Sequence, residues 1–157
     1  MPYTGDAARH PLHAAAHEGR LADLAAELAD QDAAGTLGAA LAERDRGGRG
    51  ATPLWLAANK GHLDALKLLR RHGANLDATN SGGGTALMNA VINGEADCAE
   101  ALQEWGADKD AVDSDGWTAL HCAAKYGRLE CARLLVAARA DRAKKNSDGD
   151  TALELAW

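Results

Sequence analysis

Three histidines near the start of the chain have a spacing that could serve metal binding. His10, His13 and His17 lie at positions i, i+3 and i+7, and two histidines four residues apart on a helix can share a metal ion. No cysteine or carboxylate with ligand spacing stands near them in the sequence. The sequence therefore assigns no metal ligand, and it predicts no cofactor.

The cysteines are the next candidates for chemistry. His121 precedes Cys122 directly, but adjacent residues on a helix point in different directions and cannot act as base and nucleophile. Cys98 and Cys131 lie 33 residues apart. On equivalent stacked helices their backbones would be about 8–10 Å apart, beyond the roughly 7 Å limit for a disulfide, so we expect free thiols. Three cysteines, an odd number, favour a reducing, intracellular location. The cysteines do not separate cytosol from nucleus, and of the two we expect the cytoplasm rather than the nucleus.

Two further motifs could bind phosphate or nucleic acid. The glycines at 82–84 lack both the lysine and the preceding strand of a phosphate-binding loop. Arg44, Arg46 and Arg49 form a basic cluster, but Asp45 and the glycines at 47–48 interrupt it, a third glycine follows it at 50, and no aromatic residue accompanies it. The net charge of −6 gives no general attraction to nucleic acid or anionic membranes. We therefore expect a non-catalytic protein without a nucleic-acid partner.

The composition indicates which elements must position these residues. The chain has 157 residues, about one domain, and alanine fills 37 positions, whereas 4% of residues are aromatic and none is Phe. Small side chains fill a core only if helices approach closely, which favours packed helices over a sheet sandwich. No apolar run is long enough to cross a membrane, and residues 1–10 lack the apolar stretch of a signal peptide.

A repeat of 33 residues organises the chain. Thr52, Thr85, Thr118 and Thr151 recur at this interval, and Gly61, Gly94 and Gly127 each follow a threonine by nine residues. In each unit the threonine predicts the start of a first helix, which in the second repeat covers 53–59. A second helix follows; in the same repeat it carries leucines at 63, 66 and 69 and ends at the glycine at 73. A polar turn follows at 80–84. Such short helices must stack on neighbouring copies to be stable.

These units resemble the ankyrin repeat. The fourth matches best, with Asp-Ser-Asp-Gly-Trp-Thr-Ala-Leu-His-Cys-Ala-Ala at 113–124, then Gly-Arg at 127–128 and Leu-Leu at 134–135. The resemblance implies an all-α solenoid of stacked helix-turn-helix units with β-hairpin-like loops and a concave face that binds partner proteins. It implies one domain over 1–157, with repeats at about 10–48, 49–80, 81–113 and 114–146 and a partial fifth at 147–157.

Several residues depart from the pattern. His10 replaces the threonine of the first repeat, whose helix-ending glycine we assign to Gly38, seven residues late, and we place two further extra residues at 50–51. The insertion either lengthens the second helix or forms a bulged loop around Gly35 and Gly38. Arg139 occupies a helix-ending glycine position, where a left-handed backbone costs about 1 kcal/mol.

The last repeat leaves three alternatives open. It stops at Trp157, within its first helix, so that Leu153, Leu155 and the tryptophan form an apolar end. Either Trp157 folds back over this end, or the chain is a fragment, or a partner completes the stack.

The resemblance places the partner-binding residues before each threonine and before each mid-unit glycine. They are Arg49, Asn59, Lys60, Ser81, Gly82, Ile92, Asn93, Ser114, Asp115, Trp117, Lys125 and Tyr126, with His17 and Glu18 in the first repeat. Trp117 and Tyr126 stand out, because aromatic side chains dominate interface hot spots. The alternative is that Trp117 packs on the neighbouring hairpin. Trp55, in the family's histidine position, is expected to pack within the stack, His13 to bond between repeats, and Cys122 to be buried.

The pattern as a whole predicts a rigid module that binds a partner protein through its concave face and loop tips. The alternative is a structural subunit of a larger complex, held through the open C-terminal edge. Neither interpretation identifies the partner.

Overall fold

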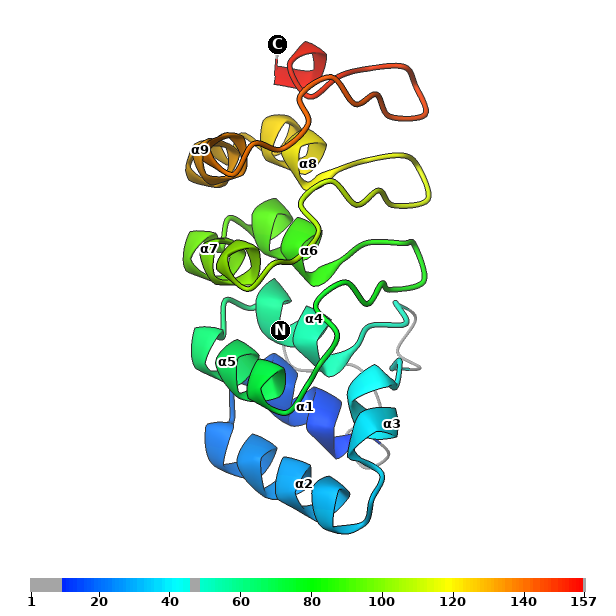
Figure 1. Ribbon diagram of the computed structural model, residues 1–157, viewed down its shortest axis with the longest axis vertical. Helices are drawn as coiled ribbons and strands as arrows, with labels where there is room; N and C mark the ends of the chain where they lie inside the picture. Colours follow the sequence, from blue (N-terminus) through cyan, green and yellow to red (C-terminus); the bar gives the residue numbers. More distant parts are fainter. Residues whose placement is uncertain (1–9, 46–48, 157) are drawn as a thin grey trace.

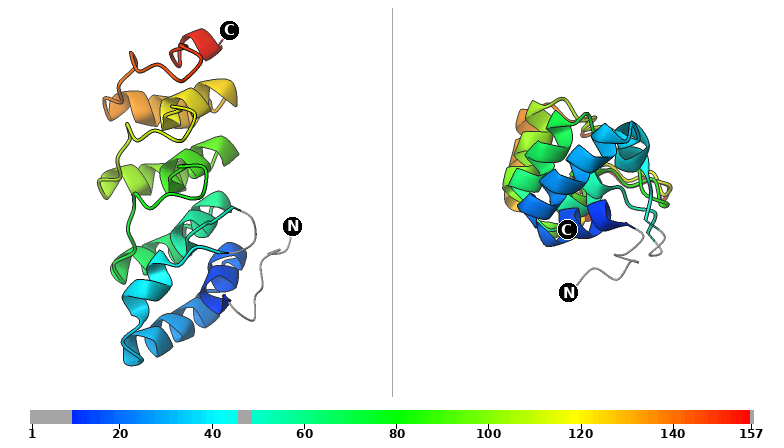
Figure 2. Two further views of the ribbon diagram at one scale, coloured as in Figure 1. Left: turned by 90° about the vertical axis from the view of Figure 1, so that its right-hand side faces the viewer. Right: turned by 90° about the horizontal axis from the view of Figure 1, so that it is seen from below.

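The computed structural model describes residues 10–45 and 49–156, which form a stack of helix pairs (Figure 1). The first helices of the pairs, here called inner helices, are α1 (Pro11–Glu18), α4 (Pro53–Asn59), α6 (Ala86–Asn93) and α8 (Ala119–Lys125). The second, outer helices are α2 (Leu21–Ala33), α5 (Leu63–Arg71), α7 (Ala96–Glu104) and α9 (Leu129–Ala137). Figure 2 shows the pairs as successive layers along the long axis.

Two short elements accompany the pairs. Helix α3 (Leu37–Ala42) follows α2, and a 3₁₀ helix, η1 (Glu154–Ala156), follows the last loop. Over the described residues no β-strand forms, apart from an isolated bridge between Lys145 and Thr151. The predicted all-α stack with hairpin-like loops is therefore confirmed.

The repeated threonines start the inner helices. The hydroxyls of Thr52, Thr85 and Thr118 each accept the backbone N–H of the residue three positions later at 3.3 Å. This bond satisfies one of the donors that a helix start leaves without an intrahelical partner. The sequence prediction of these helix starts is confirmed.

Small side chains bring neighbouring inner helices together. Ala57 and Ala58 of α4, Ala90 of α6 and Ala123 of α8 are at most 1% exposed. The outer helices add fully buried leucines, such as Leu66 and Leu102. One contiguous core therefore runs through the stack.

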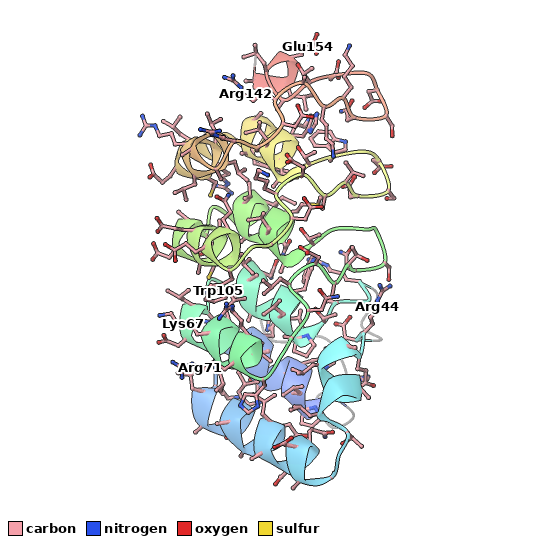
Figure 3. All side chains as sticks on the ribbon, viewed as in Figure 1. Arg44, Lys67, Arg71, Trp105, Arg142 and Glu154 are labelled. Carbon is pink, nitrogen blue, oxygen red and sulfur yellow. The ribbon has the colours of Figure 1, made fainter. Side chains whose placement is uncertain are left out.

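A cation–π contact joins two outer helices. Trp105 lies between α5 and α7 (Figure 3), and the Arg70 guanidinium carbon is 4.9 Å from the centre of its ring. Such a contact is worth about 0.5–1 kcal/mol at an exposed site.

The loops between repeats project from one side of the stack and bond to one another through the backbone (Figure 1). The N–H groups of Ser81, Ser114 and Ser147 donate at 2.9 Å to the carbonyls of Arg49, Gly82 and Asp115, respectively. Within each of the last three loops a side-chain oxygen accepts two backbone N–H groups, as Asp113 does from Asp115 at 3.0 Å and from Trp117 at 2.8 Å. The loop tips are thus held in a fixed spacing.

The insertion in the first repeat differs from the expectation. The left-handed glycine after α2 is Gly35, with φ 71°, whereas Gly38 lies inside α3. Gly35 follows His10 by 25 residues, and Gly73 follows Thr52 by 21. Assigning the helix end to Gly38 was wrong, because part of the insertion lengthens α2 to 13 residues, against nine in α5, and another part forms α3.

The two further extra residues are also placed differently. Gly50, with φ 59°, stands in register with Gly83 before the capping threonine, so residues 50–51 are not the insertion. Asp45 donates its N–H to the carbonyl of Ala51, six residues on, whereas Asn80 closes the equivalent turn with Gly84, four residues on. The extra length therefore precedes Gly50.

The C-terminal end of the stack exposes apolar side chains. Leu129 is 63% exposed, Val136 45% and Leu153 69%. In this region η1 stands where earlier repeats have a full inner helix. Trp157, proposed above to cover this end, lies outside the described residues.

No helix within 10–45 or 49–156 combines the length and the apolar character needed to span a membrane.

Replacing Arg139 by glycine is expected to stabilise the protein. Among the described non-glycine residues Arg139 alone has a positive φ, 60°, and it closes α9 in the left-handed region. Relieving this strain gains about 1–2 kcal/mol, whereas glycine loses about 0.4–1 kcal/mol through the entropy of the unfolded chain. We expect Arg139→Gly to raise the free energy of unfolding in urea by about 0.5–1 kcal/mol.

Ala138→Gly is the matched control for this substitution. Ala138 has φ −74°, so a glycine there relieves no strain and is expected to lower stability by about 0.5–1 kcal/mol. Equal effects of the two glycines would contradict the assigned backbone conformation.

Candidate functional site

A groove of about 250 Å³ lies between two loops and the inner helices. Its apolar wall includes Trp55 and Met88, of which Trp55 is buried as predicted, at 4% exposure. The loops contribute Ser114 and Asp115, and α6 contributes Ile92. The structure thus brings together four of the predicted binding residues, since Gly82 also lines the groove.

Three asparagines fix the helix surface next to this groove. The Asn89 amide donates to Asn59 Oδ1 at 2.8 Å, and the Asn93 amide donates to the same oxygen at 3.1 Å and to the Asn89 carbonyl at 2.9 Å. Asn89 is buried, so this network ties α4 to α6 from inside. The predicted residues Asn59 and Asn93 are therefore held in place before any partner binds.

The two aromatic residues singled out in the sequence differ in their surroundings. Tyr126, which ends α8, is 53% exposed, and Lys125 beside it is exposed. Trp117 is half-buried, packs against the main core and has its ring centre 6.0 Å from that of His121. Much of the Trp117 side chain thus contributes to packing, and Tyr126 offers the larger accessible aromatic surface.

The remaining predicted residues lie toward the N-terminal half of the stack. Arg49 and Ser81 are exposed at neighbouring loop tips, and Lys60 is half-buried at the end of α4. The Glu18 carboxylate accepts from Arg20 Nε at 2.8 Å, and the His17 carbonyl is 3.1 Å from His62 Nε2. His17 and Glu18 at the end of α1 and Tyr126 after α8 lie at opposite ends of the row of inner helices, with Lys60 and Ser81 between them.

The repeat geometry agrees with a comparison against known protein families. A family model described as "Ankyrin repeats (3 copies)" matches residues 12–113 and 105–157. The chain belongs to the ankyrin-repeat family. Ankyrin repeats are generally protein–protein interaction modules and are typically not enzymes. No curated protein matches the chain.

The ankyrin histidine of the fourth repeat has a structural role. His121 Nδ1 accepts the Thr118 N–H at 3.1 Å, so Nε2 carries the proton and donates to the Asp150 carbonyl at 3.1 Å. The ring thereby joins its own helix start to the next loop. Both nitrogens are engaged in these bonds, and neither serves Cys122 as a base.

The three cysteines of this ankyrin domain are buried free thiols, which confirms the predicted free thiols of Cys98 and Cys131 and the predicted burial of Cys122. Burial raises the pKa of Cys98 to about 11 and that of Cys122 to about 12. Burial also raises the pKa of Cys131. These side chains are therefore protonated at neutral pH, and a thiol is a much weaker nucleophile than a thiolate.

The basic cluster is only partly described. Arg44 donates to Thr79 Oγ1 at 3.3 Å and Arg49 is exposed, whereas Arg46 lies outside the described residues.

A cluster that sequence reasoning missed lies at the start of α1. His10 and His13 are 4% and 1% exposed, and Glu43, which follows α3, has a carboxylate oxygen 3.3 Å from His10 Nδ1. Burial lowers the pKa of His13, although the bond to the Glu43 carbonyl opposes this effect. Glu43 lies 30 residues after His13, so no local spacing in the sequence could have linked it to the histidines.

Native thiol reactivity tests the burial of the cysteines. With Ellman's reagent at pH 8 we expect the three thiols of the folded protein to react at least about 100-fold more slowly than in 6 M guanidinium chloride, because they are buried and protonated. Ser81→Cys provides an exposed control that reacts quickly in the folded state. Equal rates for this thiol and the native ones would contradict the burial.

Proposed function

We propose that this ankyrin-repeat protein is a non-catalytic interaction module that binds a partner protein through its concave face and loop tips. The observation that carries the proposal is the groove in which Ile92, Ser114 and Asp115 face a common space. The proposed contact residues are Ile92, Ser114, Asp115, Lys125, Tyr126 and Trp117, together with Asn93, Ser81, Asn59, Lys60, Arg49, His17 and Glu18.

Preorganisation supports this proposal. Arg128 Nε donates to the Ile92 carbonyl at 2.9 Å, which fixes the end of α6, and the asparagine network fixes α4 against it. The loop tips are held by backbone bonds. Because these groups are already ordered, little conformational entropy opposes association.

The charges along this surface favour a partner of complementary charge. The loop side carries Asp115 and Asp148, both exposed, whereas the inner-helix ends carry Lys60 and Lys125. We therefore expect the partner to place basic groups opposite Asp115 and acidic groups opposite Lys60 and Lys125, whereas Arg49 at the first loop tip and Glu18 at the end of α1 call for the opposite charges.

Tyr126→Ala is expected to weaken partner binding by at least about tenfold, because a large exposed aromatic side chain of an interface is a typical hot spot. Immobilised protein would be used to capture partners from the native source, and the affinity of a purified captured protein would then be measured by calorimetry. Ile92→Ser tests the groove in the same way.

Arg133→Ala is the matched control, since Arg133 lies on outer helix α9 and forms an exposed ion pair with Glu130 at 3.7 Å. Unchanged affinity in both Tyr126→Ala and Ile92→Ser would refute the proposed surface.

A second candidate is a subunit held through the open C-terminal edge. A groove of about 920 Å³ lies there, lined by Leu129, Val136 and Leu153. Along the stack α5 packs on α7 and α7 on α9, whereas in the described part of the chain no further outer helix packs on α9. We expect an amphipathic helix of the partner to pack on α9 with its apolar face, in the position that the next outer helix of the stack would take.

Leu129→Lys separates the two candidates. On the leading proposal, partner affinity in the calorimetric assay stays within about twofold of the unsubstituted protein, because Leu129 lies away from the groove around Ile92. Loss of binding in Leu129→Lys with retained binding in Tyr126→Ala would instead support attachment through the open edge.

A further inference from the structure

We propose that His10, His13 and Glu43 form a binding site for a divalent transition-metal ion, with zinc as the ion that fits best. One potential ligand atom from each residue lies within 4.8 Å of the other two. Two imidazole nitrogens and one carboxylate oxygen are a common zinc donor set, in which water takes the fourth position. The inference is independent of the proposed protein binding.

Two departures from the repeat pattern meet at this site. The first is His10, which stands where the following repeats have Thr52, Thr85 and Thr118. In the fourth repeat the threonine hydroxyl is 2.7 Å from His121 Nδ1, whereas His10 provides no side-chain cap to α1. The substitution therefore gives up a capping bond and places a second imidazole beside His13.

The second departure is the insertion that contains α3. It brings Glu43 to the two histidines, with the carboxylate oxygen 3.3 Å from His10 Nδ1. The rings of His10 and His13 are 5.2 Å apart, centre to centre. Residues unique to the first repeat thus supply both the extra imidazole and the carboxylate.

The buried nitrogens of this cluster have lone pairs to offer. Neither ring nitrogen of His10 nor Nδ1 of His13 has a hydrogen-bond partner in the part of the chain that the structure describes. A buried polar atom without a partner costs roughly 1–3 kcal/mol. Coordination of a metal ion through one nitrogen of each ring would satisfy His13 Nδ1 and one nitrogen of His10, whereas an ion pair between His10 and Glu43 leaves His13 Nδ1 without a partner.

The orientation of His13 suits coordination through Nδ1. Its Nε2 lies 2.9 Å from the Glu43 carbonyl, and because a carbonyl only accepts, Nε2 carries the proton. Nδ1 is then deprotonated. Metal-binding histidines usually donate their other N–H to a carbonyl or carboxylate in this way.

The distance between His10 and Glu43 agrees with zinc, and the third ligand atom, on His13, lies within 4.8 Å of both. Ligand atoms about 2.0–2.1 Å from a tetrahedral zinc ion lie about 3.3 Å from one another, the separation of His10 Nδ1 and Glu43 Oε1. The Glu43 side chain is 49% exposed, so it can turn to complete the set. A cavity of about 510 Å³ lined by both histidines and Glu43 gives the ion a path from solvent.

Zinc titration of the metal-free, tag-free protein tests the site. We expect calorimetry to give one bound Zn²⁺ per chain and the thermal unfolding midpoint to rise with zinc concentration, since the ion binds the folded state. Co²⁺ in place of zinc is expected to give the visible absorption of a tetrahedral complex.

Three variants make the test specific. His10→Thr restores the capping residue of the other repeats, so it is expected to fold and to lose the bound equivalent, and Glu43→Gln is expected to weaken binding at least tenfold. His72→Ala, a histidine outside the cluster, is expected to bind as the unsubstituted protein does. Absence of zinc binding by the unsubstituted protein, or equal binding by His10→Thr, would overturn the proposal.

Discussion

The architecture depends on the close approach of short inner helices, none of which could persist alone. Each has seven or eight residues, well below the roughly 12 needed for marginal stability in water. Packing against neighbouring helices supplies the stability that a single short helix lacks, and the buried alanines make this packing possible. The alanine excess in the composition is therefore partly a requirement of stacking, at positions such as Ala57, Ala58 and Ala123.

Much of this fold could be predicted because its signals are local and repeated. Thr52, Thr85 and Thr118 cap helices through bonds that span three residues, and the helix end near Gly73 follows from the left-handed backbone there. The left-handed conformation assigned to Arg139 was predicted on the same basis and is confirmed. Equivalent positions of a regular repeat have the same surroundings, so a local structure predicted for one repeat holds for the equivalent positions of the others.

The first repeat could not be predicted as well. The spacing between repeats in the sequence gives the number of inserted residues, but it does not say into which helices and loops they are built. The added residues divide among α2, α3 and the part of the sequence between Asp45 and Ala51, whose backbones are joined by a hydrogen bond. The contact of Glu43 with His10 results from that distribution. Likewise, the sequence left open whether Trp117 packs or protrudes, and its distance from His121 depends on the path of the folded loop.

The backbone bonds between successive loops make the spacing of the loops independent of the side chains at their tips. The bonds from Ser81, Ser114 and Ser147 use only main-chain atoms, so nearly any side chain at these three positions is compatible with the same loop spacing. Sequence change at the tips can therefore alter what the surface recognises while the scaffold stays constant. A displacement of one tip, in contrast, would be transmitted to the next through these bonds, so the tips move as a connected row.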